Sequence, residues 1–167
     1  MAKSLSRTDS EIAEIYGRNV NAVYWVCFNY MKNRADTDDA VSDTFVKMIK
    51  SAPVFEGEEH EKAWLIRTAA NVCKDYLKHW RRRTQDIEDY SDSLEAGGGF
   101  DVDETLDAVR RLPEKYKTAV YLYYYEGYTS VQISKILKKP QSTIRYYLHE
   151  ARKALKKELG GDFDEKQ

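Results

Sequence analysis

The chain has 167 residues, of which 42% are hydrophobic and 13% aromatic, enough for one folded domain or two small ones. Three prolines and eight glycines argue against a low-complexity chain. The sequence contains no run of about 18 apolar residues, the length needed to span a bilayer. The first residues lack the apolar segment of a secretory signal, so Cys27 and Cys73 are expected to be reduced core residues of a cytoplasmic protein.

The net charge of −1 hides a strong segregation of charge along the chain. Residues 1–83 carry a net charge of +2, residues 84–105 carry −8, and residues 106–159 carry +7. The acidic segment has neither Lys nor Arg, and it has too little apolar surface to offset the entropy lost on ordering. We therefore expect two domains, 1–83 and 106–159, joined by a flexible acidic linker at 84–105 and followed by a tail at 160–167.

Helical periodicity of apolar residues predicts two helices in the first 52 residues. The first should run from about 9 to 32, because Thr8 and Glu11 form a possible capping box. Residues 33–35 form a break. The aspartates after this break favour the positive end of a second helix, which ends before Pro53. The inward residues of this second helix are expected to be Ala40, Val41, Phe45, Met48 and Ile49. Residues 53–60 are expected to form a loop.

Residues 62–83 predict a third helix with two contrasting faces. Its buried face is expected to consist of Ile66, Ala69, Cys73, Tyr76, Leu77 and Trp80. The other face carries a basic row with an asparagine, formed by Arg67, Asn71, Lys74, Lys78, Arg81 and Arg82. Such a row, with aromatic residues interleaved, suits a nucleic-acid strand whose bases stack on rings. The alternative is a surface helix with ordinary solvated charges.

The second domain should begin with a short helix over 106–112. Pro113 suits the first position of the next helix, which should run to about Glu126 and end at Gly127. A tyrosine-rich face of this helix is interpreted as core; it is formed by Tyr116, Ala119, Val120, Tyr123 and Tyr124.

Residues 129–159 predict a helix-turn-helix. The apolar face of the short helix is Val131, Ile133, Ile136 and Leu137. Pro140 should end this helix, and the Ser142 hydroxyl could cap the next one. The longer helix turns Ile144, Leu148, Ala151, Leu155 and Leu159 inward, and its outward residues are Thr143, Arg145, Tyr146, His149, Glu150, Arg152 and Lys153. These suit base edges and phosphates in a major groove, although a solvated lysine-rich face is the alternative.

No pattern of a catalytic or metal site is present in the sequence. The aspartates at 36, 38, 39 and 43 lack the glycine and the terminal glutamate of a calcium loop, and the three histidines are scattered. No nucleophile has a partnered base. We interpret the chain as a non-enzyme without cofactor or small-molecule substrate.

The chain resembles the extracytoplasmic-function, or group-four, sigma factors of bacterial RNA polymerase over nearly its whole length. Three segments carry the resemblance in the family's order. They are Asp36-Thr37-Asp38-Asp39-Ala40-Val41-Ser42-Asp43-Thr44-Phe45; Lys62-Ala63-Trp64-Leu65-Ile66-Arg67-Thr68-Ala69-Ala70-Asn71 with Lys74-Asp75-Tyr76-Leu77 and Arg81-Arg82-Arg83; and Leu112-Pro113-Glu114-Lys115-Tyr116 with Glu126-Gly127-Tyr128-Thr129 and the helix-turn-helix.

The resemblance implies an all-α fold of two small helical domains, and as partners core RNA polymerase (its β′ clamp helices and β flap), promoter DNA and an anti-sigma factor. It assigns polymerase binding to Asp36, Asp38, Asp39, Asp43 and Phe45. It assigns minus-ten recognition to the loop at 53–60 and to Trp64, Arg67, Asn71, Lys74, Lys78, Arg81, Arg82 and Arg83. It assigns minus-thirty-five recognition to Ser142, Thr143, Arg145, Tyr146, Tyr147, His149, Glu150, Arg152 and Lys153.

The helix-turn-helix departs from the family's usual pattern. Lys138-Lys139-Pro140 stands where the family usually has a glycine, and Ser142, Tyr147 and Glu150 replace a frequent glycine and two frequent basic residues. The resemblance therefore implies no particular promoter sequence. A stand-alone helix-turn-helix regulator is one alternative, but it would not need the pattern at 36–83. A sigma-like adaptor is another, but it would be expected to have lost the basic row at 67–83.

Overall fold

A computed structural model describes residues 7–84 and 104–160, which form seven helices and no strand. The chain divides into two compact units, residues 1–97 and residues 98–167. The prediction of an all-α fold is therefore confirmed. Most of the expected linker, residues 85–103, lies outside the described residues. No helix among those described is long and apolar enough to cross a membrane.

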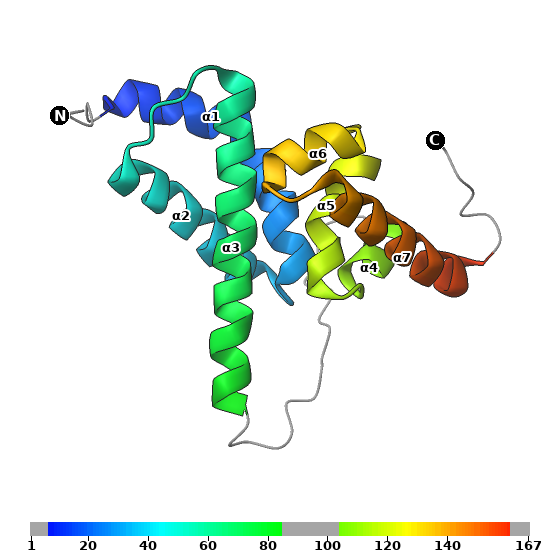
Figure 1. The fold of residues 1–167 in the computed structure, drawn as a ribbon. Coiled ribbons are helices and arrows are strands. Elements are labelled where there is room, and N and C mark those ends of the chain that lie inside the picture. The colour runs from blue at the N-terminus through cyan, green and yellow to red at the C-terminus, as the bar shows by residue number, and fades with distance from the viewer. Residues whose placement is uncertain (1–6, 85–103, 161–167) are drawn as a thin grey trace. The chain divides into compact units, whose positions relative to one another are not determined.

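The N-terminal unit packs three helices against one another: α1 (Asp9–Tyr30), α2 (Arg34–Ser51) and α3 (Glu58–Thr84) (Figure 1). The capping box expected at Thr8 is confirmed, since Thr8 Oγ1 accepts from Glu11 N–H at 3.2 Å and Glu11 Oε2 accepts from Thr8 N–H at 3.2 Å. The centre of the unit is apolar and fully buried, and includes Val23, Val26, Cys27, Met48, Leu65, Ile66 and Cys73.

Three boundaries in this unit differ from the prediction. α1 ends at Tyr30, because Met31 is already extended. α2 begins at Arg34, because the Asn33 side chain caps it by accepting from Asp36 N–H at 2.8 Å. The expected loop at 53–60 is shorter, since α3 begins at Glu58.

Several expected core positions lie at the surface. Ile49 is 47% exposed on α2. Tyr76, Leu77 and Trp80 are only half-buried, because the C-terminal end of α3 extends beyond α1 and α2 (Figure 1). The first part of α3 buries a wider arc than expected, with Leu65, Ala70 and Val72 inside, because both other helices pack against it.

An ion pair between the exposed Arg18 and the buried Glu61, absent from the sequence-based expectations, joins α1 to α3. Glu61 is 4% exposed, and its carboxylate accepts from Arg18 Nε at 3.1 Å, from Arg18 Nη2 at 2.8 Å and from Asn19 Nδ2 at 2.8 Å. Burial raises the pKa of Glu61, but the hydrogen bonds from Arg18 and Asn19 and the positive charge of Arg18 outweigh it, so that this pKa lies below its ordinary 4.5.

The C-terminal unit consists of α4 (Glu104–Arg110), α5 (Glu114–Tyr124), α6 (Ser130–Leu137) and α7 (Gln141–Leu159). α7 packs against the other three helices. The buried residues at their meeting point include Val109, Val120, Leu122, Ile133, Ile144 and Leu155. α4 begins at Glu104, two residues inside the linker that the sequence predicted.

Helix ends in this unit follow local backbone chemistry. α5 ends at Tyr124, and Gly127 takes the left-handed conformation with φ of 75°, which lets Tyr128 N–H reach the Leu122 carbonyl at 3.0 Å. α6 begins with a second capping box, formed by Thr129 and Gln132. It ends at Leu137, followed by Lys138 in the left-handed region with φ of 54° and ψ of 47°.

The expected cap at Ser142 is wrong. α7 starts at Gln141 with Pro140 in the cap position, and no side chain caps this end. The Pro140 carbonyl accepts from Thr143 N–H at 3.0 Å and Ile144 N–H at 3.2 Å, so Ser142 is an exposed residue of the first turn. Two smaller errors concern apolar faces: Val131 is 46% exposed, and α5 buries Tyr121 and Leu122 more deeply than Tyr123 and Tyr124.

We predict that Glu61→Gln lowers the free energy of unfolding of the N-terminal unit by about 1–3 kcal/mol, because the charged hydrogen bonds to Arg18 and Asn19 are weakened. Urea denaturation followed by tryptophan fluorescence measures this, since Trp25, Trp64 and Trp80 all lie in this unit. Glu59→Gln, at an exposed position in the same turn of α3, is the matched control and should change little.

The pH dependence of this effect has a defined sign. A carboxyl group whose pKa is lowered by folding stabilises the protein above its unfolded pKa, and this contribution is lost as the pH falls below 4.5 toward the folded pKa. The wild type should therefore lose more stability than Glu61→Gln between about pH 6 and about pH 3. Equal losses in the two proteins would contradict the assignment.

We predict that Lys138→Gly stabilises the C-terminal unit by up to about 1 kcal/mol, because glycine removes the steric cost of a Cβ in the left-handed region. Amide hydrogen exchange in α6 and α7 measures the change. Lys139→Gly removes the same charge at a residue without positive φ and should destabilise the unit. Equal effects of the two substitutions would contradict the strain at Lys138.

Candidate nucleic-acid interface

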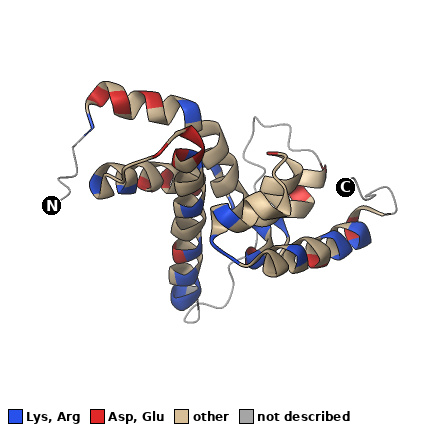
Figure 2. Ribbon diagram, turned by 45° about the horizontal axis from the view of Figure 1, so that its top comes forward, with Lys and Arg blue, Asp and Glu red and all other residues tan. Residues whose placement is uncertain are grey.

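The basic row of α3 lies on the side away from the core. Its residues recur every three or four positions and so share one face of the helix. Arg67 and Lys74 are half-buried, whereas Asn71, Lys78, Arg81 and Arg82 are exposed. Arg83 is exposed but lies seven residues after Tyr76, in line with the core side of the helix and not with the row. Lysine and arginine accumulate toward the C-terminal end of α3 (Figure 2), so the row presents concentrated positive charge.

An aromatic cluster lies at the N-terminal end of this row. The ring of Phe55, from the loop before α3, is 5.7 Å from the His60 ring and 5.8 Å from the Trp64 ring. The Arg7 guanidinium lies 4.8 Å from the centre of the Phe55 ring, and Arg7 also donates to the Pro53 carbonyl. Of this cluster, sequence reasoning had assigned Trp64 by name, and the loop at 53–60 as a whole, to minus-ten recognition; the signal for His60 was its spacing of four residues from Trp64.

A second surface is formed by α2. Asp38, Asp39 and Asp43 are exposed, whereas the Asp36 carboxylate accepts from Asn33 Nδ2 at 2.8 Å in the helix cap. Phe45 does not reach this surface: it is 6% exposed and its ring lies 4.8 Å from that of Tyr16.

Two apolar residues of α2, Val46 and Ile49, are exposed instead, at 42% and 47%. Sequence reasoning had not assigned Val46 to any role and had placed Ile49 in the core. With the exposed aspartates Asp39 and Asp43 they give α2 a mixed acidic and apolar face.

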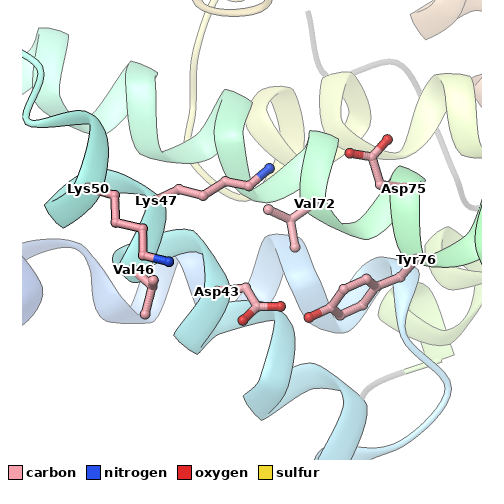
Figure 3. A pocket seen from close by; sticks show the side chains of 7 residues that line it. All are labelled: Asp43, Val46, Lys47, Lys50, Val72, Asp75 and Tyr76. Atoms are coloured by element: carbon pink, nitrogen blue, oxygen red, sulfur yellow. The ribbon is translucent and has the colours of Figure 1, made fainter.

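A hollow of about 330 Å³ separates this face from α3. It is lined by Asp43, Val46, Lys47, Lys50, Val72, Asp75 and Tyr76. Figure 3 shows the hydroxyl end of Tyr76 directed toward the Asp43 carboxylate. Its lining combines two acidic and two basic side chains with apolar ones. Charged side chains of α2 and α3 therefore stand on both sides of the hollow.

The third surface is the outer side of α7, opposite the buried stripe of Ile144, Leu148, Ala151 and Leu155. Ser142, Arg145, Tyr146, His149 and Lys153 are exposed there, and Lys and Arg residues recur along the helix (Figure 2). Thr143 is half-buried. Glu150 lies 3.9 Å from Lys153 as an ion pair within the helix, which offsets its negative charge on this face.

Two residues that the resemblance assigns to minus-thirty-five recognition are held against α5. Arg152 Nε donates to the Tyr124 hydroxyl at 3.2 Å and is half-buried. The Tyr147 ring packs 5.5 Å from that of Tyr116. A residue that sequence reasoning had not assigned, Lys115 on α5, lies with its Nζ 5.1 Å from the centre of the Tyr116 ring.

Across residues 7–84 and 104–160, no three His, Cys, Asp or Glu side chains are grouped to hold a metal ion. Cys27 and Cys73 are both buried thiols.

Two family models match the chain. Sigma-70 region 2 matches residues 15–84, and Sigma-70, region 4 matches residues 103–155. The first match contains the α2 and α3 surfaces, and the second contains the whole outer face of α7 as far as Lys153.

The chain is similar along most of its length to named relatives. It is 24% identical to the ECF RNA polymerase sigma factor SigW of Bacillus subtilis, over 90% of this chain and 88% of that protein. It is 28% identical to the ECF RNA polymerase sigma-E factor of Haemophilus influenzae, over 87% of this chain and 85% of that protein.

The fold is also similar to that of a solved structure, the sigma factor RpoE in complex with the anti-sigma factor NepR from Bartonella quintana. The TM-score is 0.68 at 20% sequence identity, over 92% of this chain and 96% of that chain. At this identity the likeness concerns the fold alone.

Proposed function

Because the chain belongs to the extracytoplasmic-function group of the sigma-70 family, we propose that it binds core RNA polymerase and directs initiation at specific promoters, without catalytic chemistry of its own. The observation that carries this proposal is the order of the three surfaces. An acidic and apolar face is followed by a basic row with aromatic rings, and a helix-turn-helix stands in the second unit. The proposed compartment is the cytoplasm.

We propose that α3 and the aromatic cluster hold the melted minus-ten element. Phe55, His60 and Trp64 offer rings for unstacked bases, while Arg67, Lys74 and the arginines at 81–83 neutralise the strand backbone. Melting costs a few kcal/mol of unstacking, which stacking and phosphate contacts offset when the bases are extruded. Asn71, exposed between these cations, can form hydrogen bonds with a base edge.

α7 is proposed to enter the major groove of the minus-thirty-five element. Recognition helices contact base edges with their N-terminal residues, which here are Ser142, Arg145 and Tyr146. Lys153 and His149 lie further along the same face and are suited to phosphates and further bases. Phosphate contacts fix the register, and each good base contact discriminates by about 1–3 kcal/mol.

The α2 face is proposed to bind the β′ clamp helices of the polymerase. Protein interfaces combine an apolar centre with a polar rim. Val46 and Ile49 supply the apolar centre, and Asp38, Asp39 and Asp43 supply the rim. The C-terminal unit would meet the β flap. With both units held on one polymerase, the second DNA contact becomes effectively intramolecular, so neither unit needs high affinity alone.

We propose that the free protein is controlled by an anti-sigma factor that covers these polymerase-binding surfaces. The complex of RpoE with NepR motivates this proposal. The exposed apolar residues of α2 support it, because such residues need a protein partner to leave water.

We predict that core RNA polymerase supplied with this protein initiates at new start sites in run-off transcription on genomic fragments. These starts should share two upstream elements at fixed spacing, because the two units read them together. Core polymerase alone is the control. No new start, with the protein nonetheless bound to duplex DNA by itself, would favour a stand-alone regulator.

A pair of variants assigns the polymerase surface in the same assay. Ile49→Glu should reduce polymerase binding and transcription by about tenfold or more, because it places an unpaired charge in the apolar centre of the interface. Ala13→Glu introduces the same charge at an exposed position of α1 and should leave both unchanged. Equal behaviour of the two variants would contradict the role of the α2 face.

A further inference from the structure

The loop that joins α2 to α3, residues 52–57, carries an unusually exposed apolar side chain (Figure 1). Among the large hydrophobic residues of 7–84 and 104–160, Val54 is the most exposed, at 80%, and Tyr146 follows at 52%. A single exposed valine is common on protein surfaces. What distinguishes Val54 is the way in which its loop is held.

The loop is fixed on both sides of Val54 by one residue from the beginning of the chain. Arg7, directly before the residue that caps α1, donates a hydrogen bond to the Pro53 carbonyl. Its guanidinium also lies 4.8 Å from the centre of the Phe55 ring. Arg7 therefore holds the residue before Val54 and the residue after it, and Val54 projects between these two fixed points.

The end of the loop is held by α3. The Phe55 ring lies 5.7 Å from the His60 ring and 5.8 Å from the Trp64 ring. His60 Nδ1 accepts a hydrogen bond from the Glu56 N–H at 3.1 Å. A rotation of the loop that turned Val54 inward would therefore break contacts with both Arg7 and α3.

The beginning of the loop is strained. Ala52 has φ of 44° and ψ of 52°, the left-handed region, which is unfavourable for a residue with a Cβ. Such strain persists only where the surrounding contacts enforce it, and it is concentrated at functional sites. An unfavourable backbone and several side-chain contacts thus together keep one apolar side chain in water.

The surroundings of Val54 indicate a base stack as its target. The rings that are proposed to receive an extruded base begin at the next residue, Phe55. Extrusion of a base opens a gap in the stack, and apolar side chains such as leucine and isoleucine enter base steps and separate them. Glu56 and Glu59, both exposed beside the loop, repel phosphates. The loop is therefore suited to the bases and not to the strand backbone.

We propose that Val54 is a wedge that enters the base stack at the edge of the minus-ten element when a base is extruded onto the rings, and that Arg7 is the positioning residue that holds this wedge. The inference rests on the proposed function, since it requires the aromatic cluster to bind the melted element. It assigns strand separation itself to one residue, distinct from the residues that hold the separated strand.

A comparison of two templates tests the wedge. One is a duplex promoter found by run-off transcription, and the other is the same promoter with the minus-ten element and both its edges opened by mismatches. Holoenzyme transcription is measured on both, and permanganate reactivity of unpaired thymines is measured on the duplex. Val54→Ala removes two methyl groups from the stack, so opening and transcription of the duplex should fall about tenfold. The mismatched template has no stack to separate and should be transcribed as by the wild type.

Two variants serve as controls for the side chain. Val54→Ile keeps a branched apolar group and should retain opening of the duplex. Val131→Ala makes the same truncation at a valine of α6 that is 46% exposed, and it should leave transcription of both templates unchanged.

The positioning role of Arg7 has its own readout. Arg7→Ala should also lose transcription on the duplex and recover it on the mismatched template, because the loop is released; a general defect in folding would lower both. The salt dependence of promoter binding distinguishes positioning from a phosphate contact. Arg7→Ala should keep the wild-type slope, whereas Arg81→Ala should reduce the slope by about one.

The outcomes distinguish this inference from the proposed function. If Val54→Ala opens the duplex as the wild type does, or if it loses equally on both templates, the wedge is overturned and the proposed function stands. If Arg7→Ala opens the duplex normally, the positioning role is overturned. If the wild type supports no transcription at all, the proposed function fails and the inference fails with it.

Discussion

In each unit a single helix carries the core on one side and positive charge on the other. Lysine and arginine are almost never fully buried, so the apolar stripes of α3 and α7 fix the direction in which their cationic faces point. The stripe of α7, from Ile144 to Leu155, is buried against α4, α5 and α6. Packing of the core therefore also determines the direction in which the charged surface faces. A change to either apolar stripe would move the surface that it supports.

The ion pair between Arg18 and Glu61 extends this coupling to the aromatic cluster. Glu61 follows His60 directly and precedes Trp64 by three residues. The ion pair therefore fixes the first turns of α3, which carry both rings. Its carboxylate is almost fully buried, and breaking it would leave a charge without compensation. In the C-terminal unit, the ring contact between Tyr116 and Tyr147 joins α5 to α7 in a comparable way. Each of these contacts links a functional surface to a helix that contributes no charged residue to that surface.

Much of this organisation could be predicted from the sequence, because it depends on local periodicity. The helices of both units, the capping box at Thr8 and the buried stripe of α7 follow from spacing alone. The errors arose where tertiary packing or backbone geometry decides. Ser142 lost the cap position to Pro140, and Ile49 and Val131 face solvent because none of the described helices covers them. The partners of Glu61 and Tyr147 lie far from them in sequence, at Arg18 and Tyr116, so no local pattern could reveal them.

The most direct test of this account is a lysine-labelling footprint of the full chain, free, with core polymerase, and with core polymerase and promoter DNA. Four exposed lysines report on the three surfaces: Lys47 and Lys50 on α2, Lys78 on α3 and Lys153 on α7. We expect core polymerase alone to protect Lys47 and Lys50, and Lys78 and Lys153 to become protected only when promoter DNA is added. Unchanged reactivity of Lys78 and Lys153 in the promoter complex would contradict the account.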